Sequence, residues 1–369
     1  MNNFCPQPWV GLDINPQGQV KPCCKYDEFL GDTIDDYFSS NKLEQLKQQF
    51  LANQRPPGCK RCWDDEDAGH QSKRLIDLQY TLSSVNLSKL KMLSLPFGNT
   101  CNLKCRTCRG ESSSRWIADE EKLRTTFPDI QIYKHQKFYK QKQFIDQIYS
   151  LSSDLENIIF PGGESFITGV PEQLEYLDFL IGKNAKNITL NYITNCTVFP
   201  DSRFWNRWKF FKKVNVQLSI DGIEDKFEYI RYPANWSEVY NNIKSYQKKQ
   251  NITSNLQLSI GHTVSIFNIL DVKDFAIWCI KEGLPKPYYG LVSQPEYFDI
   301  RFLPEEIKKA VQTKLISSAF DPLVQYMQSS TNTDPNLTLQ WIEAVDSLRN
   351  QSFYNVFPEM GDLLFKNKY

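Results

Sequence analysis

Three cysteines in the first third of the chain carry the clearest chemical signal. Cys101, Cys105 and Cys108 have the spacing C-x3-C-x2-C and directly follow an apolar, strand-like stretch at 90–97. Three thiolates so close together can hold three corners of a cubane iron–sulfur cluster, which four cysteines usually hold. The fourth iron then lacks a protein ligand, and an open metal position is typical of a catalytic site. The alternatives are a zinc knuckle or reduced core cysteines. We refer to these three residues as the loop cysteines.

A second group of cysteines lies nearer the N-terminus and offers four thiolates. Its members are Cys5, Cys23 or Cys24, Cys59 and Cys62. A hairpin with its turn at 15–18 would bring Cys5 close to Cys23. Cys59 and Cys62 form a C-x-x-C pair directly after a Pro-Pro-Gly sequence that ends the preceding helix-like run. Four thiolates complete the coordination of a metal site, so by chemistry alone this set holds either zinc or an iron–sulfur cluster.

Beyond residue 90 the chain alternates between strand-like and helix-like segments. The strand-like runs are 90–97, 155–160, 188–194, 214–220, 256–264 and 287–292. The helix-like runs are 114–123, 138–150, 171–181, 202–211, 237–248 and 272–281. Repeated strand–helix units predict a parallel sheet with right-handed crossovers. In barrels built this way the chemistry gathers at the carboxyl ends of the strands, so the residues after each strand are the candidate site.

Polar motifs follow these strands in order. After the second strand come Gly162, Gly163 and Glu164: the glycines let the backbone approach a ligand closely, and the carboxylate can accept a hydrogen bond from an ammonium group. An ordinary strand-to-helix turn is the alternative there. The segment Thr-Asn-Cys-Thr at 194–197 follows the third strand, and Ser-Ile-Asp-Gly at 219–222 follows the fourth.

The loop cysteines and these motifs together resemble the radical S-adenosylmethionine (radical SAM) enzymes. In that family the amino and carboxylate groups of SAM chelate the open iron. An electron from the cluster then cleaves SAM to methionine and a 5′-deoxyadenosyl radical. Two departures from the family pattern are visible. Thr107 stands where an aromatic residue usually precedes the last cysteine, and Cys196 takes a glycine position.

The resemblance implies that the strand-end residues bind SAM. Glu164 would hold the amino group and Arg231 the carboxylate, because a planar guanidinium binds a carboxylate bidentately; a surface ion pair is the alternative for Arg231. Asp221 would instead face the substrate or brace its loop. The predicted cofactor-binding residues are Gly162, Gly163, Glu164, Asn195, Ser219, Asp221, Arg231 and Val264.

The N-terminal cysteines resemble a twitch domain, the half-length relative of the SPASM domain that accompanies many radical SAM enzymes. The spacing from Gly18 to Cys23 and the C-x-x-C pair match that module. The resemblance implies an auxiliary [4Fe-4S] cluster, with Cys24 as a spare or alternate ligand. The module usually follows the barrel, whereas here it precedes it. We call its four expected ligands the module cysteines: Cys5, Cys23, Cys59 and Cys62.

We therefore predict an α/β fold with three parts. A partial (β/α)6 barrel of the TIM type spans 89–293, a Cys-rich twitch-like module spans 1–88, and a mostly helical C-terminal extension spans 294–369. The apolar content of 41%, with 24 Phe and 18 Tyr, suits a large packed core.

The charge balance and the distribution of apolar residues limit the kinds of partner that the sequence predicts. Lys+Arg and Asp+Glu both total 43, so no net charge draws the chain to nucleic acid or to an anionic membrane. No segment resembles a signal peptide, and no run approaches the ~20 apolar residues of a membrane span. Ten cysteines without an export signal predict metal binding in a reducing cytoplasm rather than disulfides.

The sequence thus predicts a radical SAM enzyme that cleaves SAM reductively and abstracts a hydrogen atom from a substrate. That substrate would be a peptide, a protein side chain, a sugar or a small metabolite. The implied partners are SAM and a reducing electron donor of the flavodoxin or ferredoxin type. The auxiliary cluster would assist oxidation or substrate binding. The alternative is a non-enzymatic zinc-binding interaction protein.

Overall fold

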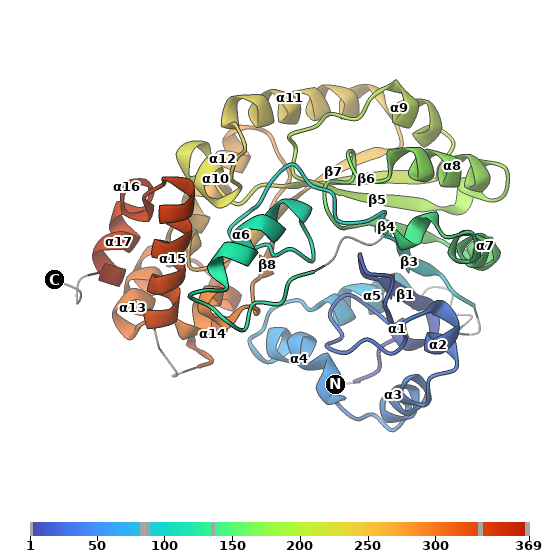
Figure 1. Ribbon diagram of the computed structural model, residues 1–369, viewed down its shortest axis with the longest axis horizontal. Helices are drawn as coiled ribbons and strands as arrows, with labels where there is room; N and C mark the ends of the chain where they lie inside the picture. The colour runs from blue at the N-terminus through green and yellow to red at the C-terminus, as the bar shows by residue number, and fades with distance from the viewer. Residues whose placement is uncertain (1–2, 82–86, 88, 134–136, 331–334, 366–369) are drawn as a thin grey trace.

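A single twisted sheet runs through the computed structural model, which describes residues 3–81, 87, 89–133, 137–330 and 335–365 (Figure 1). Among these residues eight strands pair in the order β2-β1-β3-β4-β5-β6-β7-β8. Their bounds are β1 Gly11–Ile14, β2 Val20–Lys21, β3 Met92–Ser94, β4 Asn157–Phe160, β5 Thr189–Thr194, β6 Lys213–Ser219, β7 Leu256–Val264 and β8 Pro287–Leu291. All neighbours are parallel except β1 and β2.

Strands β3 to β8 are the six strands expected of the partial barrel, each within about three residues of its predicted bounds. The helices that follow them are α6 Ile117–Leu123, α7 Lys142–Leu151, α8 Val170–Ile181, α9 Ser202–Trp208, α10 Glu224–Ile230, α11 Trp236–Ile252 and α12 Val272–Lys281. In Figure 1, α8, α9 and α11 cover the outer face of the sheet. The prediction of a partial α/β barrel is therefore confirmed.

Alternating side chains in β6 explain why the sheet has one apolar and one polar face. Val214, Val216 and Leu218 are buried beneath the helices, whereas the residues between them are half-buried and polar. The amide of Asn215 lies on that second face and donates to Asn191 of β5 across 2.8 Å. This polar face forms the inside of the partial barrel, where a hydrophilic ligand can be accommodated.

The N-terminal module is joined to the barrel through the sheet itself. Strand β1 pairs in parallel with β3, with Leu12 opposite Leu93, and β2 extends the edge in the antiparallel sense. The module helices are α1 Gln7–Val10, α2 Ile34–Phe38, α3 Asn41–Leu51, α4 Lys60–Asp67 and α5 Lys73–Thr81. The sequence predicts the hairpin at 10–20 and the helix at 40–51, but not the pairing of β1 with β3. The predicted module end at residue 88 lies outside the described residues.

The C-terminal part is helical, as predicted, with helices α13 Glu305–Lys314, α14 Asp321–Gln328, α15 Pro335–Arg349, α16 Phe353–Val356 and α17 Pro358–Phe365. They share one apolar cluster with the region around the loop cysteines, in which Trp341 of α15 packs on Trp116, with ring centroids 6.2 Å apart. Within the described ranges, none of the helices combines the length and apolarity of a membrane span.

Candidate active site

The loop cysteines lie at the carboxyl end of β3, and their loop is fixed by backbone hydrogen bonds. The amides of Lys104 and Arg106 donate to the carbonyls of Tyr232 and Ile230, each across 2.7 Å. The indole Nε1 of Trp116 donates to the carbonyl of Cys105 across 2.8 Å. The end of α10 with the residues that follow it, and Trp116 just before α6, therefore hold the loop.

The three thiols face one another closely enough to interact. Those of Cys105 and Cys108 are hydrogen-bonded to each other, which lowers the pKa of Cys108 and raises that of Cys105. Burial raises the pKa of Cys101 to about 12. Its sulfur lies 3.4 Å from the amide of Leu103 and 3.8 Å from the side-chain nitrogen of Asn195. Such N–H donors stabilise a thiolate, and hydrogen bonds to sulfur are one means of setting cluster potentials.

The two glycines after β4 bring that loop against the cysteine loop. The amide of Gly163 donates to Ser112 O (3.1 Å) and that of Glu164 to Thr100 O (2.9 Å). Both glycines have left-handed backbones, with φ of 82° at Gly162 and 51° at Gly163. A Cβ added at Gly163 would lie only 2.2 Å from the Thr100 carbonyl oxygen. Close backbone contact thus accounts for this glycine with or without a ligand.

Glu164 is completely buried, and its carboxylate joins two strand-end loops. One oxygen accepts from Thr194 Oγ1 (2.8 Å) and Phe166 N (3.2 Å), and the other accepts from Asn195 N (2.7 Å). Burial raises the pKa of this carboxyl to about 7. The second oxygen retains a lone pair for a further donor.

Arg231 forms a buried ion pair rather than the surface pair that the sequence left open. Its Nη2 lies 2.7 Å from Asp221 Oδ2, and Asp221 also accepts from the amide of Thr263 across 2.7 Å. Asp221 therefore braces its loop. No described residue accepts a hydrogen bond from Arg231 Nε, although that atom is buried. A buried donor without a partner is costly, so it marks a place where a ligand or water would be bound.

The remaining predicted SAM contacts lie at the same edge of the sheet. The side-chain Nδ2 of Asn195 donates to Asn102 Oδ1 across 3.0 Å, which links the loop after β5 to the cysteine loop. Ser219 ends β6 and is half-buried; its backbone is hydrogen-bonded to the Cys196 thiol. Val264 ends β7, and its carbonyl accepts from Val292 N (3.1 Å). The strands thus bring together the predicted residues, which are far apart in the sequence.

The module cysteines line one small cavity, about which the sequence left one choice open. Cys5, Cys23, Cys59 and Cys62 all contribute to its wall. Burial raises the pKa of Cys5 to about 12 and that of Cys62 to about 11. Cys24 does not line this cavity; it is exposed and interacts electrostatically with Lys73 and Asp13 instead.

The four module thiols share a cavity without converging on one point. In the part of the chain that the structure describes, no three His, Cys, Asp or Glu side chains meet closely enough for a single metal ion, and this holds for the loop cysteines as well as for the module cysteines. A cubane distributes its ligands over four irons, so it accepts thiolates that lie further apart than the ligands of one zinc ion with bonds of roughly 2.3 Å. The donor set is therefore compatible with an iron–sulfur cluster.

The β1–β2 hairpin connects the two cysteine groups. Its turn residue Asn15 is hydrogen-bonded to the carboxyl of Glu111, which follows the cysteine loop. A Cβ at Gly162 would lie 3.6 Å from Cγ of Pro16 in the same turn. Two residues beyond β2 comes Cys23. The hairpin thus contacts the first site with its turn and provides a ligand candidate of the second.

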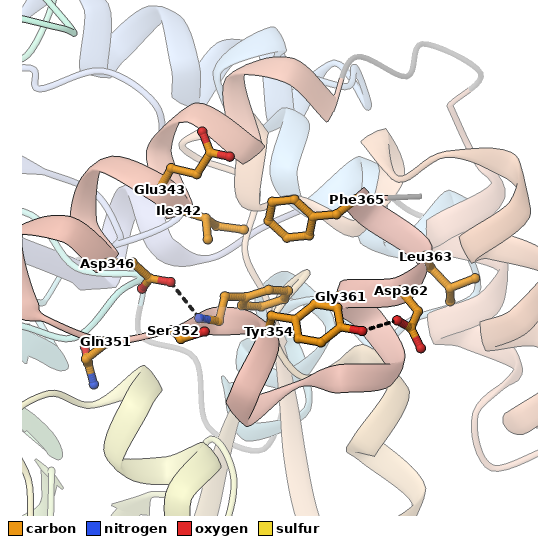
Figure 2. Close-up of a pocket in the computed structure, with 11 residues that line it drawn as sticks. Ile342, Glu343, Asp346, Gln351, Ser352, Tyr354, Gly361, Asp362, Leu363 and Phe365 are labelled. Carbon is orange, nitrogen blue, oxygen red and sulfur yellow. Dashed lines mark hydrogen bonds between the residues drawn. The ribbon is translucent and has the colours of Figure 1, made fainter. Parts of the chain in front are cut away.

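Several contacts of the cysteine loop were not predicted. Arg106 lies flat on Tyr229, with its guanidinium carbon 3.8 Å from the ring centroid, and donates to Asp346 and Gln351. Those two acceptors also line a cavity of about 850 Å³ between α15, α16 and α17 (Figure 2). All residues that line this cavity belong to the C-terminal extension, and the fully buried Arg106 reaches two of them from the cysteine loop. In the sequence, the position of Arg106 between Cys105 and Cys108 was the feature from which these contacts could have been suspected.

Comparison with known proteins finds one curated relative over about half of the chain. No family model matches the chain. A cysteine-type anaerobic sulfatase-maturating enzyme of Clostridium novyi (strain NT) is 25% identical over 201 residues, which cover 51% of this chain and 50% of that protein. The chain thus spans about half the length of this curated relative.

Solved structures with related folds include native anSMEcpe with bound AdoMet, with a TM-score of 0.43, 15% identity, and 65% of this chain and 63% of that chain covered. Streptococcus suis SuiB bound to S-adenosylmethionine has a TM-score of 0.40 and 12% identity, with 81% and 62% covered. Both TM-scores are below 0.5, so the sequence match carries the conclusion. Over about half of its length the chain is similar to a curated sulfatase-maturating enzyme, which agrees with the resemblance to the radical SAM enzymes that the order of its motifs indicates.

Proposed function

We propose that the chain is a radical SAM enzyme that binds a [4Fe-4S] cluster through the loop cysteines and SAM at the iron they leave open. The observation that carries this proposal is the grouping of three interacting thiols at the carboxyl end of β3, beside the buried Arg231 Nε. When bound, the cluster and SAM supply one-electron reduction and a hydrogen-abstracting carbon radical. The chain's own residues orient the ligands and exclude water.

The residues around the thiols would each take one part in binding and orienting these ligands. The Asn195 side chain and the Leu103 amide donate to the Cys101 sulfur, which favours the ionised thiolate that binds iron. Glu164 offers its remaining lone pair to the ammonium group of SAM, and Arg231 offers Nε to the carboxylate. Gly162 and Gly163 allow the loop that carries Glu164 to reach the cysteine loop.

The homology favours a protein side chain among the four substrate classes. The Clostridium novyi relative is named for the maturation of a sulfatase, so its substrate is itself a protein. The polar inner face of the sheet, with the half-buried Asn191 and Asn215, would accept the polar backbone of such a substrate. The electron would come from a donor of the flavodoxin or ferredoxin type in the cytoplasm.

The module cysteines would hold an auxiliary [4Fe-4S] cluster that takes an electron from the substrate radical or shapes the substrate pocket. Two observations support this part of the proposal. The four thiols line one cavity, and the hairpin that leads to Cys23 contacts the loop after β4. A second cluster would thus be close to the first site through a single short hairpin.

The test begins with anaerobic reconstitution of the full chain. The loaded protein should contain about eight irons per chain. Its reduced form should give an EPR signal that changes on addition of SAM, and it should release 5′-deoxyadenosine. Deuterium that passes from a labelled candidate substrate into 5′-deoxyadenosine would identify the abstracted hydrogen.

Two variants separate the proposal from other roles of cysteine. Cys101→Ala should abolish the SAM-dependent change, whereas Cys279→Ala, in the apolar interior of α12, should preserve it. A colourless protein with two zinc ions and no iron would instead support the zinc-binding interaction protein. If the EPR signal does not change when SAM is added, the cluster has no open iron.

A further inference from the structure

Several buried arginine side chains lie close to the cysteine loop. Arg106 belongs to the loop itself and Arg349 ends helix α15 of the C-terminal extension, and the side chains of both are fully buried. Arg231, on the other side of the loop, is 10% exposed. Burying a guanidinium is expensive unless anionic groups compensate the charge.

The described part of the chain does not satisfy all of these donors. Arg106 uses Nη2 for Asp346 (2.5 Å) and Gln351 (2.9 Å), while its Nε and Nη1 have no acceptor there. Arg349 has no acceptor for Nε, Nη1 or Nη2; its ion pair with Asp119 spans 3.6 Å. Lys104 lies nearer to the same carboxylate, at 2.7 Å. Asp119 therefore only partly compensates the charge of Arg349.

Two aromatic rings that contact the cysteine loop also hold Arg349. The guanidinium carbon lies 4.4 Å from the ring centroid of Trp116 and 5.0 Å from that of Tyr232. Both rings belong to residues that hold the loop: the Trp116 indole donates to the Cys105 carbonyl, and the Tyr232 carbonyl accepts from Lys104. Arg349 and the Cys105 thiol also interact electrostatically.

We propose that Arg349, assisted by Arg106, raises the reduction potential of the cluster on the loop cysteines. Three thiolates and an added electron make the loaded site negative, and buried positive charge beside Cys105 favours the reduced form. The inference rests on the proposed function, because it needs a cluster at this site. It makes the C-terminal extension part of the redox machinery, since α15 supplies the charge.

The physical basis is the Coulomb interaction in a site that water does not screen. Cluster potentials depend on net charge, hydrogen bonds to sulfur and solvent exposure. At an effective dielectric constant of about 20, opposite unit charges several ångströms apart interact by more than the equivalent of a tenfold change in an equilibrium. Loss of one guanidinium should therefore lower the ratio of reduced to oxidised cluster about tenfold, or about 59 mV for one electron.

The experiment is an EPR-monitored redox titration of the loaded full-length protein, which follows the SAM-responsive signal. Arg349→Gln should lower the midpoint potential by about 59 mV, and Arg349→Lys should restore most of it. Asp119→Asn removes a nearby negative charge, so it should raise the potential. Arg203→Gln is the matched control, because Arg203 forms an exposed ion pair with Asp201 on α9.

The outcomes distinguish the two proposals. A wild-type protein without a SAM-responsive signal contradicts the proposed function and this inference with it. A normal wild-type signal with the same potential in Arg349→Gln overturns only the inference. If Arg349→Gln fails to load iron, Asp119→Asn decides: a raised potential supports the inference, and an unchanged or lowered one overturns it.

Discussion

Gly163→Ala tests whether the loop after β4 must touch the cysteine loop. The added Cβ would lie 2.2 Å from the Thr100 carbonyl oxygen and 2.9 Å from the carbonyl carbon of Asn99. Because real Cβ atoms essentially never come within 3.0 Å of another heavy atom, the backbone next to Cys101 has to move by roughly 1 Å. The substitution therefore acts on the cysteine loop itself.

Two terms set the cost of this substitution. A non-glycine residue at a left-handed φ loses roughly 1–2 kcal/mol, part of which the reduced freedom of the unfolded chain offsets. Overpacking in a tight contact adds roughly 1–3 kcal/mol. We expect Gly163→Ala to lower the free energy of unfolding by about 2–4 kcal/mol. Its loaded form should also show a weaker SAM-dependent EPR change than wild type.

Gly283→Ala is the matched control. Gly283 has a similar φ of 65°, but an added Cβ there meets nothing within 4 Å. Only the backbone term applies, so the expected loss is about 1 kcal/mol. Urea unfolding of both iron-free variants measures the difference. Equal losses in the two variants would refute the close contact between the loops.

Three further perturbations address the cysteines and the C-terminal helices. Replacement of all three loop cysteines by alanine should lower the iron content, measured by iron analysis, from about eight to about four per chain. It should also abolish SAM cleavage in a product assay. Retained cleavage would rule out the loop cysteines as the site. Cys62→Ala should lower iron to about four while the SAM-dependent EPR change persists, whereas Cys24→Ala should leave the iron content at wild-type level. Asp346 accepts hydrogen bonds from Arg106, Tyr229 and the backbone amide of Phe353. Because Asp346→Asn would leave the buried Arg106 without its anionic partner, it should lower the free energy of unfolding in urea by about 3–5 kcal/mol. A loss below about 1 kcal/mol would contradict this contact.

The strands of the barrel were predictable because their pattern is local. Strand β7 alternates buried and partly exposed residues over nine positions, and α12 coincides with its predicted span of 272–281. Helix α10, of seven residues, was not predicted. Periodicity within one segment thus carries most of the information that a single sequence offers about the fold.

Contacts between distant segments were not predictable in this way. Nothing local in the four residues of β1 indicates that β3 is its partner. Likewise, Arg349 looks like an ordinary basic residue at a helix end, and only the fold brings it to Trp116. The spacing from Gly18 already favoured Cys23 over Cys24, and the fold adds that Cys23 lines the cavity of the module cysteines whereas Cys24 is exposed.

The pairing of β1 with β3 brings the N-terminal segment, which precedes the barrel in the chain, to the edge of the sheet where the cysteine loop lies. Strand β1 runs parallel to β3, so its carboxyl end lies at the same edge as the cysteine loop. The chain then turns at Asn15, contacts Glu111, and returns through β2 towards Cys23. No long linker separates the two cysteine groups along this path. A displacement of the hairpin would therefore alter the surroundings of the loop cysteines and of the module cysteines together.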